Sequence, residues 1–441
     1  MKRLLSLLLC AVLALFCATT AQAAGVSITL TASEYALHYA FDAGAQDPFV
    51  ILEYTTPAEK GWMMLYSADG HFEGDVSLAY SGAGGKTSVA LTSARTTGSI
   101  GKASTTLPKA ADYQKPTGKS NAKVTDFVLT ETPEGFHYAF NAIGTDYMLL
   151  YWRSKEQTVT QPVYPDENGH YEGDVVSELT FARTQFTVQV KSGSGSMKKE
   201  ATVRKGYQAP EAPQRQEGRL SGVTVCIDAG HQENGRFVNE PIGPGLSGST
   251  SGKGGMAQGT KTNRRESIVC LEIGMLLRDE LLRQGANVVM TREDQTTFHT
   301  NIERCEIAEA GGAQIMLRLH CNNSSNRSKR GIQVYGPLNS DYAKAVADAD
   351  TYREMGQRLL DAMKTRVGMT LANSTGMVRL NDNYVGNNWA KMMCFLVEMG
   401  YLSNPAEEYL LVTPVYQQWL AEGMADGVYE IAVARGWVQA Q

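Results

Sequence analysis

The chain is poor in cysteine, with seven in 441 residues, and the five that follow residue 24 do not occur in close pairs. This spacing argues against a disulfide framework and against a cysteine-rich metal site. We therefore expect these five residues to be mainly buried thiols: Cys226, Cys270, Cys305, Cys321 and Cys394.

The sequence also lacks a basic stripe with interleaved aromatic residues, and its formal net charge is −5. These features exclude the usual nucleic-acid binder. After residue 24 no stretch is long and apolar enough to span a bilayer, so no integral membrane segment is expected. Residues 1–23 instead have a basic start, an apolar core and a small-x-small ending, which predicts a cleaved signal peptide and a secreted protein.

Two similar segments follow the predicted signal peptide. His38-Tyr-Ala-Phe41 recurs as His137-Tyr-Ala-Phe140, and GHFEGDV at 70–76 recurs as GHYEGDV at 169–175, both at an offset of 99 residues. Because two motifs share one offset, the pattern indicates a duplicated unit. Alternating polar and apolar residues between turn signals predict two tandem all-β sandwich-like repeats, over residues 25–108 and 122–206.

Two roles remain open for these repeats. They could be wall-binding modules that keep an enzyme on its polymer through avidity. They could equally be spacers, in which the repeated histidines and aromatic residues serve the core and the turns.

The rest of the chain changes character after a proline-containing linker at 207–219. Residues 220–437 alternate between apolar runs and amphipathic segments, which predicts an α/β domain with a mostly parallel sheet and helices on both faces. The expected strands are 223–227, 286–291, 314–319, 331–335, 377–380 and 393–397, and the expected helices are 266–283, 302–310, 341–366 and 415–435.

Four polar side chains stand at the ends of these elements. His231 follows the run VTVCIDAG, Glu266 begins a helix, and His320 and Glu398 each close an apolar run. Two imidazoles and one carboxylate are a familiar ligand set for catalytic zinc, with the fourth position open for water. The second carboxylate is then free to act as a general base.

These residues resemble the catalytic domain of zinc-dependent N-acetylmuramoyl-L-alanine amidases of the amidase-3 type. The matching pieces are IDAGH at 227–231, the helix that Glu266 begins, AQIMLRLHCNN at 313–323 and VEMGYLSNPAEEYLL at 397–411. The resemblance implies a cell-wall-associated hydrolase of peptidoglycan. It also implies Zn²⁺ held by His231, Glu266 and His320, with Glu398 as the catalytic carboxylate and Asn322 as a substrate contact or a turn residue.

The sequence departs from the family pattern at two positions and leaves two other functions open. Ala229 stands where the family usually has proline, and Arg318 stands where it usually has serine. Arg318 alternates with the apolar residues of its strand, so we expect its side chain to point away from the core. The loop at 239–263 is long and glycine-rich, as expected for a mobile rim of a substrate groove. The alternatives are a zinc peptidase that acts within the stem peptide and a non-catalytic wall-binding protein.

Overall fold

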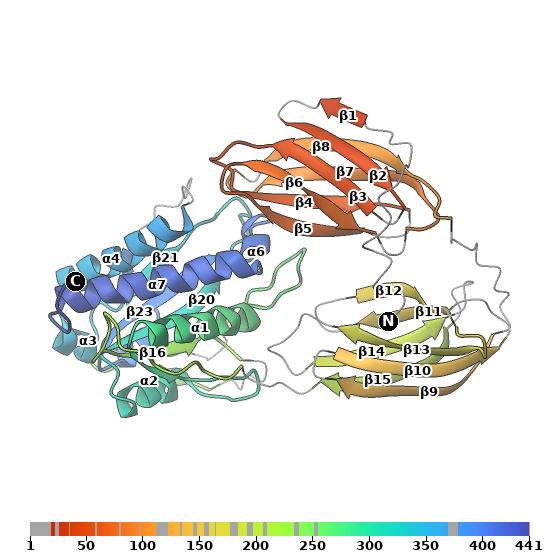
Figure 1. The fold of residues 1–441 in the computed structure, drawn as a ribbon. Coiled ribbons are helices and arrows are strands. Elements are labelled where there is room, and N and C mark those ends of the chain that lie inside the picture. The colour runs from red at the N-terminus through yellow and green to blue at the C-terminus, as the bar shows by residue number, and fades with distance from the viewer. Residues whose placement is uncertain are drawn as a thin grey trace. The chain divides into compact units, whose positions relative to one another are not determined.

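The structure is a computed structural model, and the chain divides into two compact units, residues 1–117 and 118–441, which are described separately (Figure 1). The predicted signal peptide falls mostly on residues 1–18, outside the described residues. The structure describes residues 19–22, 26–34, 36–57, 60–78, 81–96, 98–111, 122–132, 135–143, 148–153, 158–163, 165–176, 184–191, 197–205, 210–232, 238–250, 255–368 and 378–440.

The first unit is all-β, with two antiparallel four-stranded sheets. One sheet has the order β1 (Thr19–Gln22), β2 (Ser27–Ser33), β3 (Ala36–Asp42) and β6 (His71–Ser77). The other has the order β5 (Lys60–Tyr66), β4 (Phe49–Thr55), β7 (Gly85–Ser93) and β8 (Ser99–Leu107). Inward residues of both sheets, such as Leu37 and Leu52, form one apolar core, as alternating strands require.

Residues 122–205 also form two antiparallel sheets. One has the order β13 (His170–Val176), β10 (Gly135–Ile143) and β9 (Lys123–Thr132). The other has the order β12 (Thr158–Val163), β11 (Met148–Arg153), β14 (Thr184–Lys191) and β15 (Met197–Lys205). The N-terminal region is therefore all-β, as predicted, whereas the duplication itself stays an inference from the sequence.

The repeated GH(F/Y)EGDV motif has a packing role in both places. Tyr39 pairs with Gly74 across β3 and β6, and Tyr138 pairs with Gly173 across β10 and β13. A Cβ atom added to either glycine would lie 2.7 Å from the Oη atom of the paired tyrosine. A larger residue at either position would have to displace the tyrosine ring, so packing favours the recurrence of glycine.

The C-terminal region is built on one six-stranded sheet. Its order is β19 (Asn287–Met290), β16 (Thr224–Ala229), β20 (Ile315–Asn322), β23 (Met393–Tyr401), β21 (Gln333–Gly336) and β22 (Val378–Leu380). All neighbours pair in parallel except β21 and β23, so the sheet is mixed, with one reversal. A short antiparallel pair, β17 (Glu240–Pro241) and β18 (Ser249–Thr250), stands apart from it.

Helices cover both faces of this sheet. On one face α1 (Glu266–Arg283), α4 (Ala349–Val367) and α7 (Pro414–Ala434) pack side by side (Figure 1). On the other face α2 (Asn301–Ala310) and α5 (Val385–Trp389) cover a cluster that includes Met316 and Cys394. Successive strand residues point to opposite faces, and helices cover both faces. The central strands are therefore apolar on both sides.

The predicted helix at 341–366 is wrong in one respect, because it is two helices. The first, α3 (Asp341–Val346), ends where Ala347 becomes extended. Asp348 then caps α4 by accepting a hydrogen bond from the Thr351 N–H group, and a cap of this kind starts a new helix. Prediction also missed two short helices, α5 and α6 (Glu407–Leu410). Among the described residues, no helix is long and apolar enough to cross a membrane.

Candidate metal centre and catalytic carboxylate

His231 lies directly after the carboxyl end of β16 in a conformation that few residues adopt. Its φ angle is 57°, in the left-handed region. The Gly230 N–H group donates to the Leu319 carbonyl at 2.9 Å, and Arg304 donates to the His231 carbonyl at 3.2 Å. These bonds hold the turn that directs the imidazole toward the neighbouring strand β20.

Glu266 reaches the same place from the first residue of α1. Its Oε2 atom accepts from the Ala257 N–H group at 2.8 Å, and its Oε1 atom accepts from the Cys321 N–H group at 3.1 Å. The positive end of the helix dipole also favours a carboxylate at this position. The side chain is therefore fixed, and only 3% of the residue is exposed.

The three predicted ligands meet at one point. His231 Nε2 lies 3.1 Å from Glu266 Oε1, and His320 Nδ1 lies 2.9 Å from the same oxygen. One potential ligand atom from each residue lies within 4.8 Å of the other two. Among the described residues, this is the group that has the spacing of a metal site.

His320 Nε2 provides a test of whether a metal ion fits. This atom is buried and has no hydrogen-bond partner among the described residues. If Nδ1 donates its proton to Glu266, Nε2 carries a lone pair, which is the form in which imidazole binds a metal ion. The donor set and the unpartnered nitrogen fit a divalent cation such as Zn²⁺.

The charges of the site are consistent with this reading. Burial alone would raise the pKa of Glu266, but hydrogen bonds from His231 and His320 outweigh it and hold that pKa below its usual range. Burial lowers the pKa of His320 and keeps the imidazole neutral. An ionised carboxylate and a neutral imidazole are the forms that bind metal.

Glu398 stands beside the three ligands. It pairs with His320 across β20 and β23, so both side chains point to the same face of the sheet. Its Oε2 atom is buried and lacks a hydrogen-bond partner among the described residues. Burial, followed by the negative charge of Glu266, raises the pKa of Glu398 to about 8. A carboxyl group with a pKa near neutrality can both accept and return a proton.

Asn322, the predicted substrate contact, lies on the same strand two residues beyond His320. Its Nδ2 atom donates to Gln333 Oε1 at 3.3 Å, and the Tyr335 hydroxyl group donates to the same oxygen at 2.5 Å. Gln333 pairs with Glu398 across β21 and β23. Asn322 is thus linked to the strand position next to Glu398 through Gln333. The sequence did not reveal this link.

The expectation that Arg318 points away from the core is wrong. The residue is 4% exposed, and its Nε atom lies 2.8 Å from Asp228 Oδ2. Asp228 is fully buried and also binds Arg304 and the Thr291 hydroxyl group. Arg304 in turn donates to the carbonyl groups of Ala229 and His231, so this network supports the turn that carries the first ligand.

The described parts of the loop at 239–263 are held at several points. Glu240 accepts from the Asn301 and Ile302 N–H groups at the start of α2. Glu408, fully buried, accepts from the Lys261 and Thr262 N–H groups at the other end of the loop. Residues 251–254, in the middle of the loop, lie outside the described residues.

The five cysteines expected to be thiols are all free and buried, as predicted. Burial raises the pKa of each of them, and that of Cys305 reaches about 12. A thiol must ionise to act as a nucleophile. Burial therefore disfavours the thiolate form of Cys321, next to His320.

The C-terminal region also matches known proteins. Residues 225–430 match the sequence model of the family described as N-acetylmuramoyl-L-alanine amidase. The resemblance seen in the sequence is confirmed for these residues.

Individual relatives match about half of the chain. The uncharacterized protein YqiI of Bacillus subtilis (strain 168) is 27% identical over 209 residues, which cover 47% of this chain and 84% of YqiI. The probable cell wall amidase LytH of Staphylococcus aureus is 27% identical over 218 residues, which cover 48% of this chain and 60% of LytH. A solved N-acetylmuramoyl-L-alanine amidase from Clostridium difficile 630 is 23% identical, with a TM-score of 0.38, over 48% of this chain and 96% of that structure.

Proposed function

We propose that this protein is an exported, zinc-dependent N-acetylmuramoyl-L-alanine amidase that hydrolyses the amide between N-acetylmuramic acid and L-alanine in peptidoglycan. The observation that carries the proposal is the meeting of His231, Glu266 and His320 beside a second carboxylate, Glu398, inside the region that matches the amidase family. The name of the relative LytH, a probable cell wall amidase, supports the choice of substrate.

The geometry supports the following roles. Zn²⁺ bound by His231, Glu266 and His320 would act as a Lewis acid that polarises the substrate carbonyl and lowers the pKa of water. Glu398 takes a proton from the attacking water at its unpartnered Oε2 atom and returns it to the nitrogen of the leaving L-alanine. Asn322, fixed by Gln333, orients the substrate at the rim.

The metal assignment is tested by elemental analysis of purified protein. We expect one zinc per chain and its loss in His320→Ala, because the remaining histidine and carboxylate are a poor zinc site. His299→Ala is the matched control, since His299 belongs to the same domain but not to the ligand group. Full zinc occupancy in His320→Ala would show that the ligand assignment is incorrect.

The bond is tested by digestion of purified cell wall. An amidase releases new L-alanine amino termini and creates no new reducing ends in the glycan. Glycoside hydrolysis needs two free carboxyl groups, and Glu266 is assigned to the metal here, which leaves Glu398 alone. Labelling of the new amino termini and mass spectrometry identify the residue. Labels mainly on residues farther along the stem would favour the zinc peptidase instead.

The two tandem β units, residues 25–108 and 122–206, are proposed to be repeats that act as a spacer. The packing of Gly74 and Gly173 against tyrosine gives the glycine of the repeated motif a structural role. Wall binding remains the alternative, and sedimentation of residues 25–206 with purified wall would support it.

A further inference from the structure

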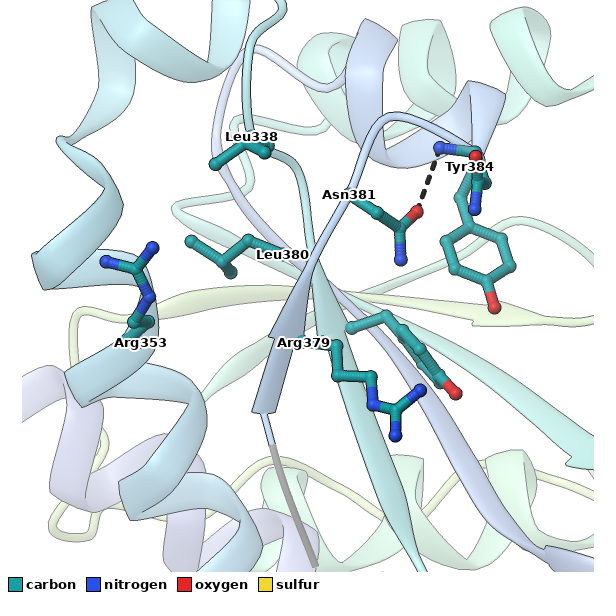
Figure 2. A pocket seen from close by; sticks show the side chains of 8 residues that line it. Leu338, Arg353, Arg379, Leu380, Asn381 and Tyr384 are labelled. Carbon is teal, nitrogen blue, oxygen red and sulfur yellow. Dashed lines mark hydrogen bonds between the residues drawn. The ribbon is translucent and has the colours of Figure 1, made fainter. Parts of the chain in front are cut away.

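A cavity of about 590 Å³ lies at the edge of the six-stranded sheet, around β22. Figure 2 shows that Arg379 and Tyr384 lie on one side of this strand, whereas Arg353 and Leu380 lie on the other. Tyr335 of β21 also lines the cavity. The alternation of side chains along the strand divides the cavity into two halves.

The half with Arg379 belongs to the same face of the sheet as the catalytic carboxylate. Glu398 pairs with Gln333, and Tyr335, two residues beyond Gln333, pairs with Arg379. Side chains of paired residues and of residues two apart point to one face. The path from Glu398 to Arg379 crosses two gaps between neighbouring strands, about 4.8 Å each, and runs two residues along β21, about 6.6 Å. These perpendicular distances place the two Cα atoms about 12 Å apart.

The side chains that lie between these two residues on this face include Gln333, Tyr335 and Tyr384. The Tyr335 hydroxyl group binds Gln333 Oε1 at 2.5 Å, and the Tyr335 and Tyr384 rings lie 5.1 Å apart. Burial, followed by the charge of Glu398, raises the pKa of Tyr335, which keeps the hydroxyl group protonated.

Arg379 is exposed, and no described carboxylate forms an ion pair with it. Its guanidinium has the planar fork that binds a carboxylate through two hydrogen bonds. Asn381 adds a donor, because its Oδ1 atom accepts from the Asn383 N–H group while its amide NH₂ faces the same cavity (Figure 2). Arg353, in contrast, is already paired with Asp350 at 2.6 Å.

We propose that this half of the cavity is a subsite for a carboxylate of the peptide substrate, with Arg379 as the residue that selects it. The inference rests on the proposed amidase function. An extended peptide spans about 3.5 Å per residue, so 12 Å corresponds to about three residues. The selected carboxylate is therefore carried by one of the first three residues after the scissile amide.

The test compares pairs of synthetic muramyl peptides that differ only in one side group. In one pair the residue after L-alanine carries a carboxylate or the matching carboxamide, and in the other pair the next residue does. Wild-type protein should prefer the carboxylate in one pair. Arg379→Gln should lower kcat/KM for that substrate by about 10- to 100-fold and leave the carboxamide unchanged, because only a charged hydrogen-bonding partner is lost.

Arg353→Gln is the matched control, since it removes an arginine from the other half of the same cavity and should leave both values unchanged. Calorimetric binding of the released peptide to metal-free protein should show the same loss in Arg379→Gln. Equal effects on carboxylate and carboxamide, or no effect on either, would overturn the subsite. If wild-type protein cleaves neither pair, the proposed function fails and the subsite fails with it.

Discussion

Replacement of Asp228 by asparagine should destabilise the C-terminal region strongly, although residue 228 is not one of the predicted ligands. The Asp228 carboxylate is fully buried and holds Arg304, Arg318 and Thr291. Burial alone would raise the pKa of Asp228, but the two guanidinium groups hold that pKa well below its usual range. The group is therefore ionised at any working pH.

The magnitude follows from the charges that remain. Asparagine would leave two buried guanidinium groups without an anion, and breaking a buried ion pair in this way costs about 3–5 kcal/mol. A domain of this size loses about 2–4 °C in Tm per kcal/mol, so we expect Tm to fall by roughly 6–20 °C.

The dependence on pH has a definite sign. Because the pKa of Asp228 is lower in the folded state than in the unfolded chain, its contribution is full above the unfolded pKa of about 3.9. It is lost as pH falls toward the folded pKa. The stability difference between wild type and Asp228→Asn should therefore be constant from pH 5 to 9 and should shrink below about pH 4.

Calorimetry at fixed zinc concentration is the assay, because a bound ligand also shifts Tm. Asp426→Asn is the matched control: this aspartate also contacts two arginines, Arg219 and Arg366, but its side chain is 25% exposed. An exposed pair contributes about 0–1 kcal/mol, so the control should change Tm little. Equal losses in the two variants would refute the argument that burial makes the Asp228 network strong.

Three further predictions concern the site and its surroundings. Gly230→Ala should weaken zinc binding, measured by competition with a chelator, because the added Cβ would lie 2.4 Å from the Leu319 carbonyl oxygen, whereas Gly255→Ala meets no atom within 4 Å. Glu398→Gln should retain zinc and lower turnover on soluble muropeptides by about 10²–10⁴-fold, since an amide cannot accept the proton; near-normal turnover would assign the base to another group. Glu408→Gln should accelerate amide hydrogen exchange at Lys261 and Thr262 by about tenfold or more, because one of two accepting oxygens is lost, and unchanged exchange would show that the carboxylate does not hold the loop.

Much of the fold could be predicted because the local pattern carries it. The helix expected at 266–283 is found as Glu266–Arg283, with Gly285 just beyond it at a φ of 94° that favours glycine. The strands that end near His231, His320 and Glu398 were expected from apolar runs, and carboxyl ends of parallel strands meet at one edge. That rule was enough to place His231, His320 and Glu398 together, and the expected helix start placed Glu266 at the same edge.

Other features depended on contacts between residues far apart in the chain. Arg318 alternates with apolar neighbours and was expected to point outward, yet it is buried because Asp228, 90 residues away, neutralises it. The pKa of Glu398 near 8 likewise depends on burial by other elements and on the charge of Glu266. The cavity beside Arg379 exists because β21 reverses the direction of the sheet and brings β22 to its edge. Alternation along a strand says which residues share a face, but only tertiary packing decides whether a charge on that face meets solvent, a partner or a substrate.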